Sequence, residues 1–422
     1  MISGLIRYLR DPLHKNSLFL IGSYIAIAVL GFIFWIIAAR LYTSEEVGLA
    51  TALVSAILLL NILSKLGVDI SLIRFLPNEV DKRGMINTSF TIVGLFSVAL
   101  AIIFILGLRL WSPALLIIRE KLSYSLLFVL FNVATTFVLL QQQGIFVALR
   151  ATQFSFVIQV IAGLRLLLLV CAVSFGTYGI FSSWGLASCV AFAAGILFLM
   201  RLQPRYRPVP GIQKRLAGNM LHFSISNYLA DSLKDLPGFI LPLLIINILK
   251  PEMGAYFYIA WTIIGAILMI PYGTCFSLLA EGSYQPERLR SDVIRAMKFI
   301  FLLLIPAILL VFLLGDRLLS LFGREYSDNA FKLLWILALS GIPIAFNTLY
   351  ITVKRVQQQF KPVLGIYAFI ALFTIGASYA LMKEEGLVGI GIAWTLGQAI
   401  VSLFLGAAIL RRRVQGIRPS SR

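Results

Sequence analysis

Residues 17–39 read SLFLIGSYIAIAVLGFIFWIIAA, a run that contains no charged side chain. A helix of this length crosses the hydrocarbon core of a bilayer, which is ~30 Å thick. The run is too long for the core of a signal peptide, and it follows a basic leader that contains Arg7, Arg10 and Lys15. We therefore expect a retained first membrane span whose amino end lies in the cytoplasm.

Apolar runs of this kind recur along almost the whole chain. Hydrophobic residues make up 60% of the 422 residues and charged residues 13%, and the mean hydropathy is +0.94. Main-chain polar groups in lipid must be hydrogen-bonded within their own segment, so each run is expected to be a helix. The sequence thus predicts an all-α polytopic membrane protein with about twelve transmembrane helices, at residues 17–39, 47–64, 85–108, 122–141, 155–175, 178–199, 219–248, 253–280, 296–314, 330–352, 362–382 and 386–410.

The net charge of +18 is carried mainly by connections between these spans, notably residues 201–215, 288–298, 354–361 and 411–413. Lys and Arg are concentrated in the cytoplasmic connections of membrane proteins. The pattern predicts a multi-pass protein of the cell membrane, inner or plasma, with both termini in the cytoplasm. Because the basic residues fit this rule, we expect no nucleic acid as a partner.

Residue types that catalysis and metal binding need are scarce. The chain has only His14 and His222, and its three cysteines, Cys171, Cys189 and Cys275, lie inside apolar segments without metal-ligand spacing. We interpret the cysteines as small core residues. A membrane glycosyltransferase or polymerase would need a positioned base and a sizeable outer loop, so we expect no enzyme, no metal site and no cofactor.

The longest hydrophilic connection, Arg201–Gly218, contains three prolines and divides the chain into two halves. We expect six-helix bundles at residues 1–203 and 204–422. Phe131-Asn132 is followed by three glutamines in the first half, as Phe346-Asn347 is in the second. An even number of spans per half makes the halves parallel-related around a central cavity, which is typical of transporters.

Charged residues inside apolar spans are the candidate functional groups. Arg165 lies near the middle of the fifth span, where a charge costs about 2.5 to 3.5 kcal/mol. The seventh span places Asn227, Asp231 and Lys234 on one helix face, with Asp235 beside them. This face is expected to point into the protein, and not at lipid.

Two prolines, Pro237 and Pro242, follow this charged face directly. Proline removes a main-chain donor, so we expect the seventh span to break or bend there. A broken, charged helix beside a repeat interface is a sequence indicator of a transport site.

Two interpretations of these charges stay open. In the first, Asp231 and Lys234 form an internal ion pair that only fixes packing, and Arg165 snorkels or binds carbonyls. In the second, the cations hold an anionic headgroup, and Asp231 or Asp235 takes part in coupling to H⁺ or Na⁺. Weaker candidates for substrate contacts are Asn132, Asn347, Lys65 and Arg74. Polar residues of these kinds serve mostly as packing contacts or topology signals.

Three short motifs resemble a known family. Residues 40–48 read RLYTSEEVG, residues 66–75 read LGVDISLIRF, and residues 251–256 read PEMGAY. They are similar to the R-L-x-S-P-E-E-F-G, L-G-L-x-x-x-L-I-R-F and P-E-A-x-G-x-Y patterns of polysaccharide-biosynthesis flippases. That family belongs to the multidrug/oligosaccharidyl-lipid/polysaccharide (MOP) exporter superfamily, and the span count extends the resemblance over nearly the whole chain.

The resemblance implies a flippase that turns a polyprenyl-diphosphate oligosaccharide or polysaccharide precursor from the cytoplasmic to the outer leaflet by alternating access. Arg165 and Lys234 would meet the diphosphate, and Asn132, Asn227 and Asn347 would meet sugar hydroxyls. Expected partners are the lipid-linked oligosaccharide, membrane lipid and other polysaccharide-assembly proteins. The alternative is a cation-coupled drug or metabolite antiporter of the same superfamily, with Asp231 or Asp235 as its binding carboxylate.

Overall fold

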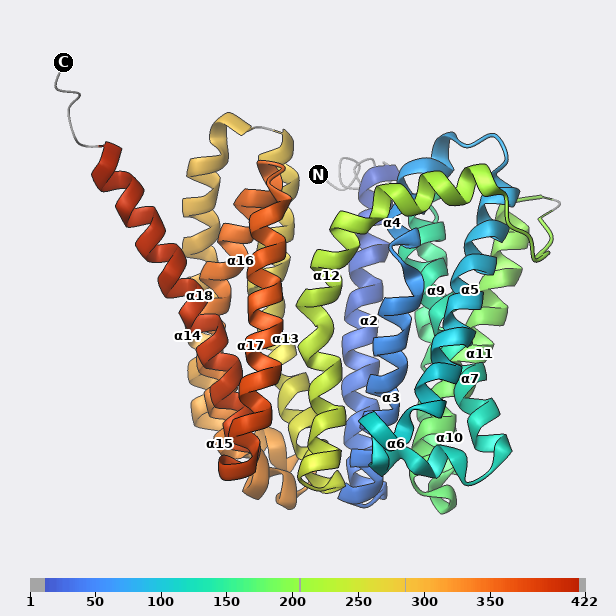
Figure 1. The fold of residues 1–422 in the computed structure, drawn as a ribbon, viewed down its shortest axis with the longest axis horizontal. Coiled ribbons are helices and arrows are strands. Elements are labelled where there is room, and N and C mark those ends of the chain that lie inside the picture. Colours follow the sequence, from blue (N-terminus) through green and yellow to red (C-terminus); the bar gives the residue numbers. More distant parts are fainter. Residues whose placement is uncertain (1–11, 205, 285, 417–422) are drawn as a thin grey trace, which may run out of the picture. The chain divides into compact units, whose positions relative to one another are not determined.

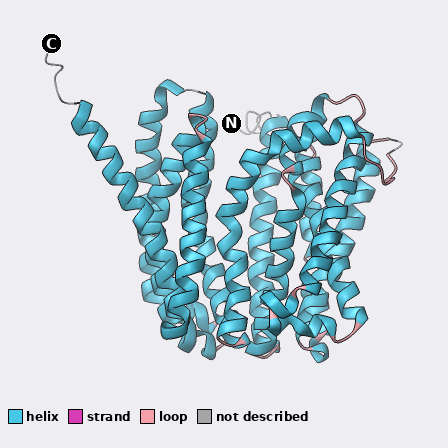
Figure 2. Cartoon of the chain, in the orientation of Figure 1, coloured by secondary structure: helices cyan, strands magenta, loops and turns pink. Residues whose placement is uncertain are grey.

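The structure, a computed structural model, describes residues 12–204, 206–284 and 286–416, and their regular secondary structure is entirely helical (Figure 2). The all-α prediction is confirmed. The longer helices are α2 (Pro12–Leu41), α3 (Ser44–Lys65), α4 (Val68–Phe75), α5 (Lys82–Leu106), α7 (Leu122–Leu140), α9 (Thr152–Ala162), α10 (Arg165–Cys171), α11 (Thr177–Leu202), α12 (Lys214–Ile248), α13 (Pro251–Tyr284), α14 (Leu289–Ser320), α15 (Arg324–Leu339), α16 (Gly341–Val356), α17 (Phe360–Glu385) and α18 (Leu387–Gly416). Short elements join them: η1 (Leu76–Asn78), α6 (Leu108–Trp111), η2 (Pro113–Arg119), η3 (Gln141–Ile145), α8 (Phe146–Ala148), η4 (Val173–Phe175) and η5 (Pro286–Arg288).

The chain forms two compact units. The first consists of Met1–Ser232 with Lys250–Ala255, and the second of Leu233–Leu249 with Tyr256–Arg422. The first unit therefore extends along α12 beyond residue 203. The division into six-helix halves at that residue stays a prediction.

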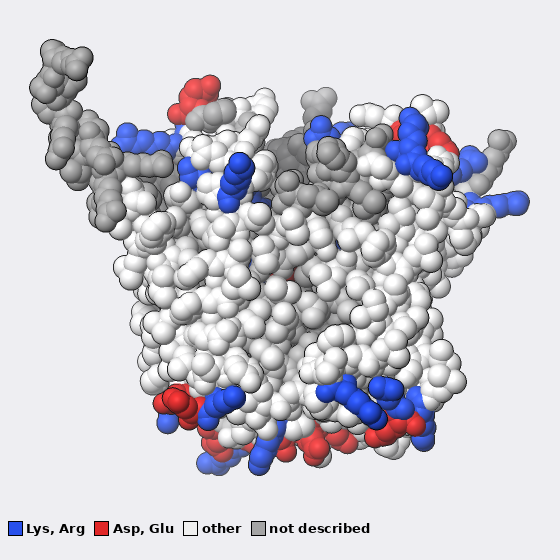
Figure 3. Space-filling view, viewed as in Figure 1, with Lys and Arg blue, Asp and Glu red and all other residues white. Residues whose placement is uncertain are grey.

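Helices cover all twelve predicted spans. Among the described residues, eleven helical stretches are long and apolar enough to cross a membrane. The seventh passage, α12, is not one of them because it carries Asp231, Lys234 and Asp235. In each unit, most Lys, Arg, Asp and Glu side chains in view gather at the two ends of the helices and leave an uncharged band between them (Figure 3). This band is what lipid tails require.

Three passages are less regular than the sequence predicted. The fifth is divided into α9 and α10 at Gly163 and Leu164, and the tenth into α15 and α16 at Ser340. The fourth continues through η3, a five-residue stretch of π-helix, before it ends in α8. Such π-helical turns are often found at functional sites.

Of the break or bend predicted for the seventh span, the break is not present, and a bend stays a prediction. The helix α12 continues from Lys214 to Ile248 with Pro237 and Pro242 inside it. A helix tolerates a proline where neighbouring groups satisfy the freed carbonyl, as happens in membrane proteins. The prediction that the cysteines are core residues is correct only for Cys275, because Cys171 is exposed and Cys189 half-buried.

The beginning of α12 crosses one end of the first unit beside α4 (Figure 1). Its residues Leu216 and Met220 are buried in one cluster with Leu72 of α4 and Met85 of α5. The hydroxyl of Ser71 donates a hydrogen bond of 2.7 Å to the main-chain oxygen of Met220. The start of α12 is thus anchored on the first unit by apolar burial and by a buried hydrogen bond.

The proline-rich connection before α12 is fixed along α5. Arg83 donates to the main-chain oxygen of Pro204 at 3.0 Å, and Asn87 donates to that of Arg207 at 3.0 Å. Further along, the main-chain N–H of Gly211 donates to the hydroxyl of Thr91 at 3.0 Å. A segment that reads as a loose linker is therefore held to one helix by a series of side-chain contacts.

Candidate functional site

Arg165 is the first residue of α10 and lies inside the apolar fifth passage. Its guanidinium lies over the ring of Phe34 in α2, 5.5 Å from the ring centroid. The Nε and Nη2 atoms are shielded from solvent, and Nη2 is the atom nearest to where a side chain on Gly31 would begin, at 3.9 Å. An aromatic face stabilises a desolvated cation, so α2 and α10 together hold this charge within the apolar region.

Lys234 is the candidate cation of the second unit. Its Nζ atom lies 3.4 Å from Oδ1 of Asp235 and 5.8 Å from the ring centroid of Tyr272 in α13. The side chains of Lys234 and Asp235 are 36% and 44% exposed, so both are accessible. An aromatic ring and a carboxylate thus flank this amine, and the ion pair is loose enough for an anionic ligand to compete with it.

The packing interpretation paired Lys234 with Asp231, whereas the structure pairs Lys234 with Asp235. Asp231 is half-buried and belongs to the part of α12 that lies in the first unit. The side chain of Asn227, another predicted contact, lies outside the described residues. The candidate groups of α12 are therefore distributed over both units, and their roles in binding or coupling stay predictions.

Two asparagines at matching positions, Asn132 of α7 and Asn347 of α16, are buried and engaged in helix packing. Asn132 donates to the main-chain oxygen and hydroxyl of Ser97 at 3.0 and 2.7 Å, and it accepts from Asn61 at 3.3 Å. Asn347 donates to the main-chain and side-chain oxygens of Gln398, both at 2.9 Å. These contacts join neighbouring helices, while the predicted contact with sugar hydroxyls stays a prediction.

Lys65 belongs to a polar cluster at the end of α3. Its Nζ atom lies 2.9 Å from Oδ2 of Asp69 and donates to the side-chain oxygen of Gln143 at 2.8 Å. The side chains of Lys65 and Asp69 are only 13% and 15% exposed. The cluster joins α3, α4 and η3, and Gly144 lets η3 approach α4 because a side chain there would touch the main chain of Asp69.

Arg74, the remaining cationic candidate, is exposed near the end of α4. Its guanidinium lies 5.7 Å from the ring centroid of Phe75. This position is compatible with a phosphate contact at the membrane surface and equally with a topology signal. The described residues contain no group of three or more His, Cys, Asp or Glu that could hold a metal ion.

The family-like motifs are structural junctions of the first unit. Thr43 caps α3 by accepting from the N–H of Glu46 at 3.3 Å, and the Glu46 carboxylate accepts from the N–H of Thr43 at 2.9 Å. This reciprocal pair is a capping box. Tyr42 donates from its hydroxyl to the main-chain oxygen of Leu169 at 2.7 Å, which ties the motif to α10. The motif therefore positions the helix that begins with Arg165.

Sequence reasoning missed the partners of the candidate charges. Asp69 is four residues from Lys65, a spacing that suggests an ion pair, but Gln143 and Tyr272 are distant in sequence from the cations that they contact. Phe34 was visible only as one apolar residue of the first span. No local signal indicates such pairings.

Comparison with known proteins adds to this geometry. The model of a family described as polysaccharide biosynthesis protein matches residues 13–229. No curated protein matches the chain.

Several solved structures have a similar fold. An inward-facing multidrug resistance MATE family transporter of the MOP superfamily has a TM-score of 0.69 at 16% identity, covering 94% of this chain and 96% of its own. The lipid II flippase MurJ in an inward closed conformation has a TM-score of 0.72 at 13% identity, covering 93% and 87%. A MOP superfamily transporter from Pyrococcus furiosus has a TM-score of 0.61 at 16% identity, covering 97% and 96%. The predicted fold class, a MATE-like polytopic helical protein, is confirmed.

Proposed function

The chain belongs to the polysaccharide biosynthesis protein family, and from this premise we propose that it is a flippase for a lipid-linked oligosaccharide or polysaccharide precursor. The substrate would be a polyprenyl-diphosphate sugar that moves from the cytoplasmic to the outer leaflet by alternating access. The lipid II flippase among the proteins of similar fold supports a lipid-linked substrate by analogy.

The observation that carries the proposal is the guanidinium of Arg165, held against Phe34 inside the apolar fifth passage. A cation inside an apolar membrane passage is costly, and such residues commonly mark substrate or ion pathways. Guanidinium binds phosphate oxygens in a bidentate manner, which suits a diphosphate. Lys234 gives the second unit an accessible cation of its own.

Each unit thus has one candidate cation for the diphosphate. In this proposal both termini lie in the cytoplasm of the inner or plasma membrane, as the distribution of Lys and Arg predicts. Outward movement of a diphosphate down a cytoplasm-negative potential is favoured by about 2.3 kcal/mol per charge per 100 mV. Coupling to H⁺ or Na⁺ through Asp231 or Asp235 is therefore allowed but not required.

A second candidate is a cation-coupled antiporter that exports drugs or metabolites. The accessible carboxylate of Asp235 favours it, as do the MATE transporters of similar fold. In that case the carboxylate would bind the exported cation, and Lys234 would hold Asp235 until the ligand arrives. Neutralisation of Asp235 separates the two candidates. An antiporter would lose its binding carboxylate and with it transport, whereas a flippase would keep its cationic site and with it transport.

Charge reversal in cells tests the proposal. We expect Arg165→Glu and Lys234→Glu to remove surface glycan and to trap the lipid-linked precursor on the cytoplasmic leaflet, while Arg165→Lys and Lys234→Arg retain part of the export. Lys361→Glu, which reverses an exposed charge at the start of α17, is the matched control and should export normally. Membrane levels of each variant are measured alongside. Normal export by both reversed variants at normal levels would overturn the proposal.

A further inference from the structure

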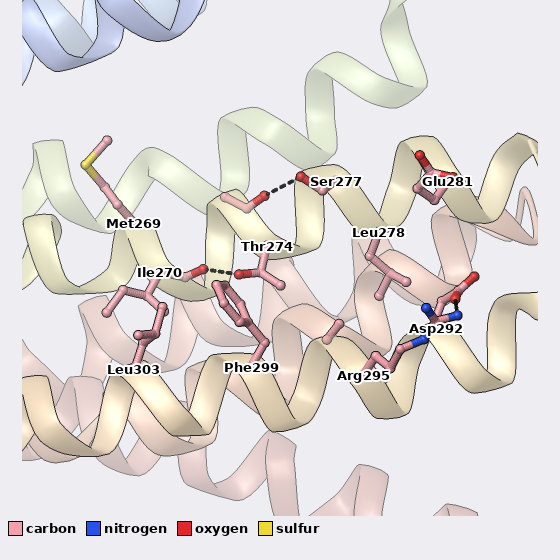
Figure 4. A pocket seen from close by; sticks show the side chains of 12 residues that line it. Met269, Ile270, Thr274, Ser277, Leu278, Glu281, Asp292, Arg295, Phe299 and Leu303 are labelled. Atoms are coloured by element: carbon pink, nitrogen blue, oxygen red, sulfur yellow. Dashed lines mark hydrogen bonds and ion pairs between the residues drawn. The ribbon is translucent and has the colours of Figure 1, made fainter. Parts of the chain in front are cut away.

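A groove of about 590 Å³ lies between α13 and α14 in the second unit (Figure 4). Most of its length is apolar. The side chains that form this apolar part include Met269, Ile270, Phe299 and Leu303. Phe299, Leu303 and Met269 are 52%, 41% and 48% exposed, so the groove opens on the surface of the unit. An open apolar groove in a membrane protein can bind a lipid acyl chain, because the chain buries its apolar surface there.

The other end of the groove is charged. Of the described residues that line it, three carry charge: Glu281, Asp292 and Arg295. Nη2 of Arg295 lies 2.7 Å from Oδ1 of Asp292. The Arg295 side chain is 73% exposed, so it can reach a ligand without losing Asp292, which is 18% exposed. Figure 4 shows these three side chains together, away from Met269 and Leu303.

The charged and apolar ends of the groove are separated along α14. Arg295 and Leu303 are eight residues apart on α14, which corresponds to about 12 Å along the helix axis. The charged end lies where α13 ends and α14 begins, at the same end of the second unit as the last turns of α18 (Figure 1). A headgroup at this end and a chain along the apolar part would match the polarity of one bilayer leaflet.

We propose that this groove binds a zwitterionic phospholipid whose headgroup carries a primary ammonium, such as phosphatidylethanolamine. The lipid phosphate would accept hydrogen bonds from Arg295, and the ammonium would donate to the carboxylates of Glu281 and Asp292. The inference does not rest on the flippase assignment, since it concerns a resident lipid of the second unit.

Charge complementarity selects this headgroup over other lipids. Two carboxylates and one guanidinium give the charged end a net charge of −1. Phosphatidylglycerol would bring a phosphate without a cation to this end. Phosphatidylcholine carries a cation, but its trimethylated nitrogen has no N–H to donate to a carboxylate. A polyprenyl diphosphate would bring two or more negative charges to the two carboxylates.

The test measures which lipid the full-length protein retains. The protein is purified from nanodiscs with equal amounts of phosphatidylethanolamine, phosphatidylcholine and phosphatidylglycerol, and the bound lipids are counted by native mass spectrometry. We expect phosphatidylethanolamine to be retained about tenfold over each of the others, as hydrogen bonds between charged groups allow. Glu281→Gln and Asp292→Asn should each reduce this preference, and together they should remove it.

The matched control is Lys298→Gln, which removes an exposed charge on α14 three residues beyond Arg295, outside the groove lining. It should keep the preference for phosphatidylethanolamine. If Glu281→Gln does not accumulate, Asp292→Asn and Arg295→Gln decide the question by the same measurement. Equal retention of the three lipids, an unchanged preference in the groove variants, or displacement of phosphatidylethanolamine by an equimolar polyprenyl diphosphate would each overturn the proposal.

Discussion

The main-chain oxygen of Pro251 occupies the space where a side chain on Gly48 would begin. Gly48 lies in the first turns of α3, and Pro251 is the first residue of α13; both belong to the first unit. Two of the three motifs that resemble family signatures, residues 40–48 and 251–256, therefore meet at one close main-chain contact. Only glycine permits this approach, which explains the residue type at that position.

Gly48→Ala should consequently destabilise the protein strongly. A Cβ atom would overlap main-chain atoms, which cannot move away as a flexible side chain can, and overpacking costs about 1–3 kcal/mol or more. The expected result is a lower melting temperature of the purified protein and a lower yield from membranes. Gly265→Ala in α13, where the new Cβ meets no atom within 4 Å beyond its own stretch of helix, should lower neither. Equal melting temperatures for the two variants would contradict this explanation.

Asn132→Ala separates packing from sugar binding. The change removes donors to Ser97 in a fully buried site, and we expect it to cost about 1–3 kcal/mol in unfolding free energy. Melting curves should show the loss, whereas Asn329→Ala, at an exposed position of α15, should leave them unchanged. A variant with normal stability that has lost glycan export would instead assign Asn132 to the substrate path.

Lys65 and Asp69 should be energetically coupled. Their ion pair is largely shielded from solvent, and Gln143 adds a hydrogen bond to the same amine. In a double-mutant cycle with Lys65→Met and Asp69→Asn, we expect a coupling energy of about 0.5–1.5 kcal/mol, read from unfolding free energies. Additive effects of the two changes would show that the pair does not hold α3, α4 and η3 together.

Asp81 links the connection before α12 to the start of α5, and this link should depend on pH. Hydrogen bonds from Gln213, at 2.7 Å, and from the N–H of Gly84, at 2.9 Å, lower the pKa of the Asp81 carboxyl. A pKa that is lower in the folded state stabilises the fold above the unfolded-state pKa, which is about 3.9. The contribution is lost as the pH falls through the folded-state value.

Asp81→Asn should therefore be less stable than the parent protein at pH 7, and the melting temperatures of the two should converge as the pH falls through the lowered pKa of Asp81. The control, Asp328→Asn, changes an exposed carboxylate of α15 and should show no such convergence. A difference between Asp81→Asn and the parent that is constant with pH would exclude the ionised carboxylate as the cause.

The membrane fold could be predicted because hydropathy reports directly whether a segment lies in lipid. All twelve passages were found, as were the charged residues Arg165 and Lys234 inside them. The capping box of Thr43 and Glu46 lies within a motif that the sequence had already singled out. These features depend on residues that are close to one another in sequence.

The remaining features depend on contacts between distant segments. The π-helix η3, the division of the fifth passage and the continuity of α12 through Pro237 are decided by how main-chain groups are satisfied by neighbouring helices. The attachment of the connection before α12 to α5 arises in the same way, from side chains such as Asn87 that have no local partner. Composition and hydrophobic periodicity do not indicate which distant residues make these contacts.

The most direct test of the central claim is transport by the purified protein in proteoliposomes. A fluorescent polyprenyl-diphosphate oligosaccharide is placed in one leaflet, and its arrival in the other is measured for the parent, Arg165→Gln and the control Lys361→Gln. We predict transbilayer movement for the parent and the control, and at least a tenfold slower rate for Arg165→Gln, as expected when a charge-assisted contact with the diphosphate is lost. No movement of the lipid-linked sugar, together with export of a soluble organic cation, would contradict the flippase and favour the antiporter.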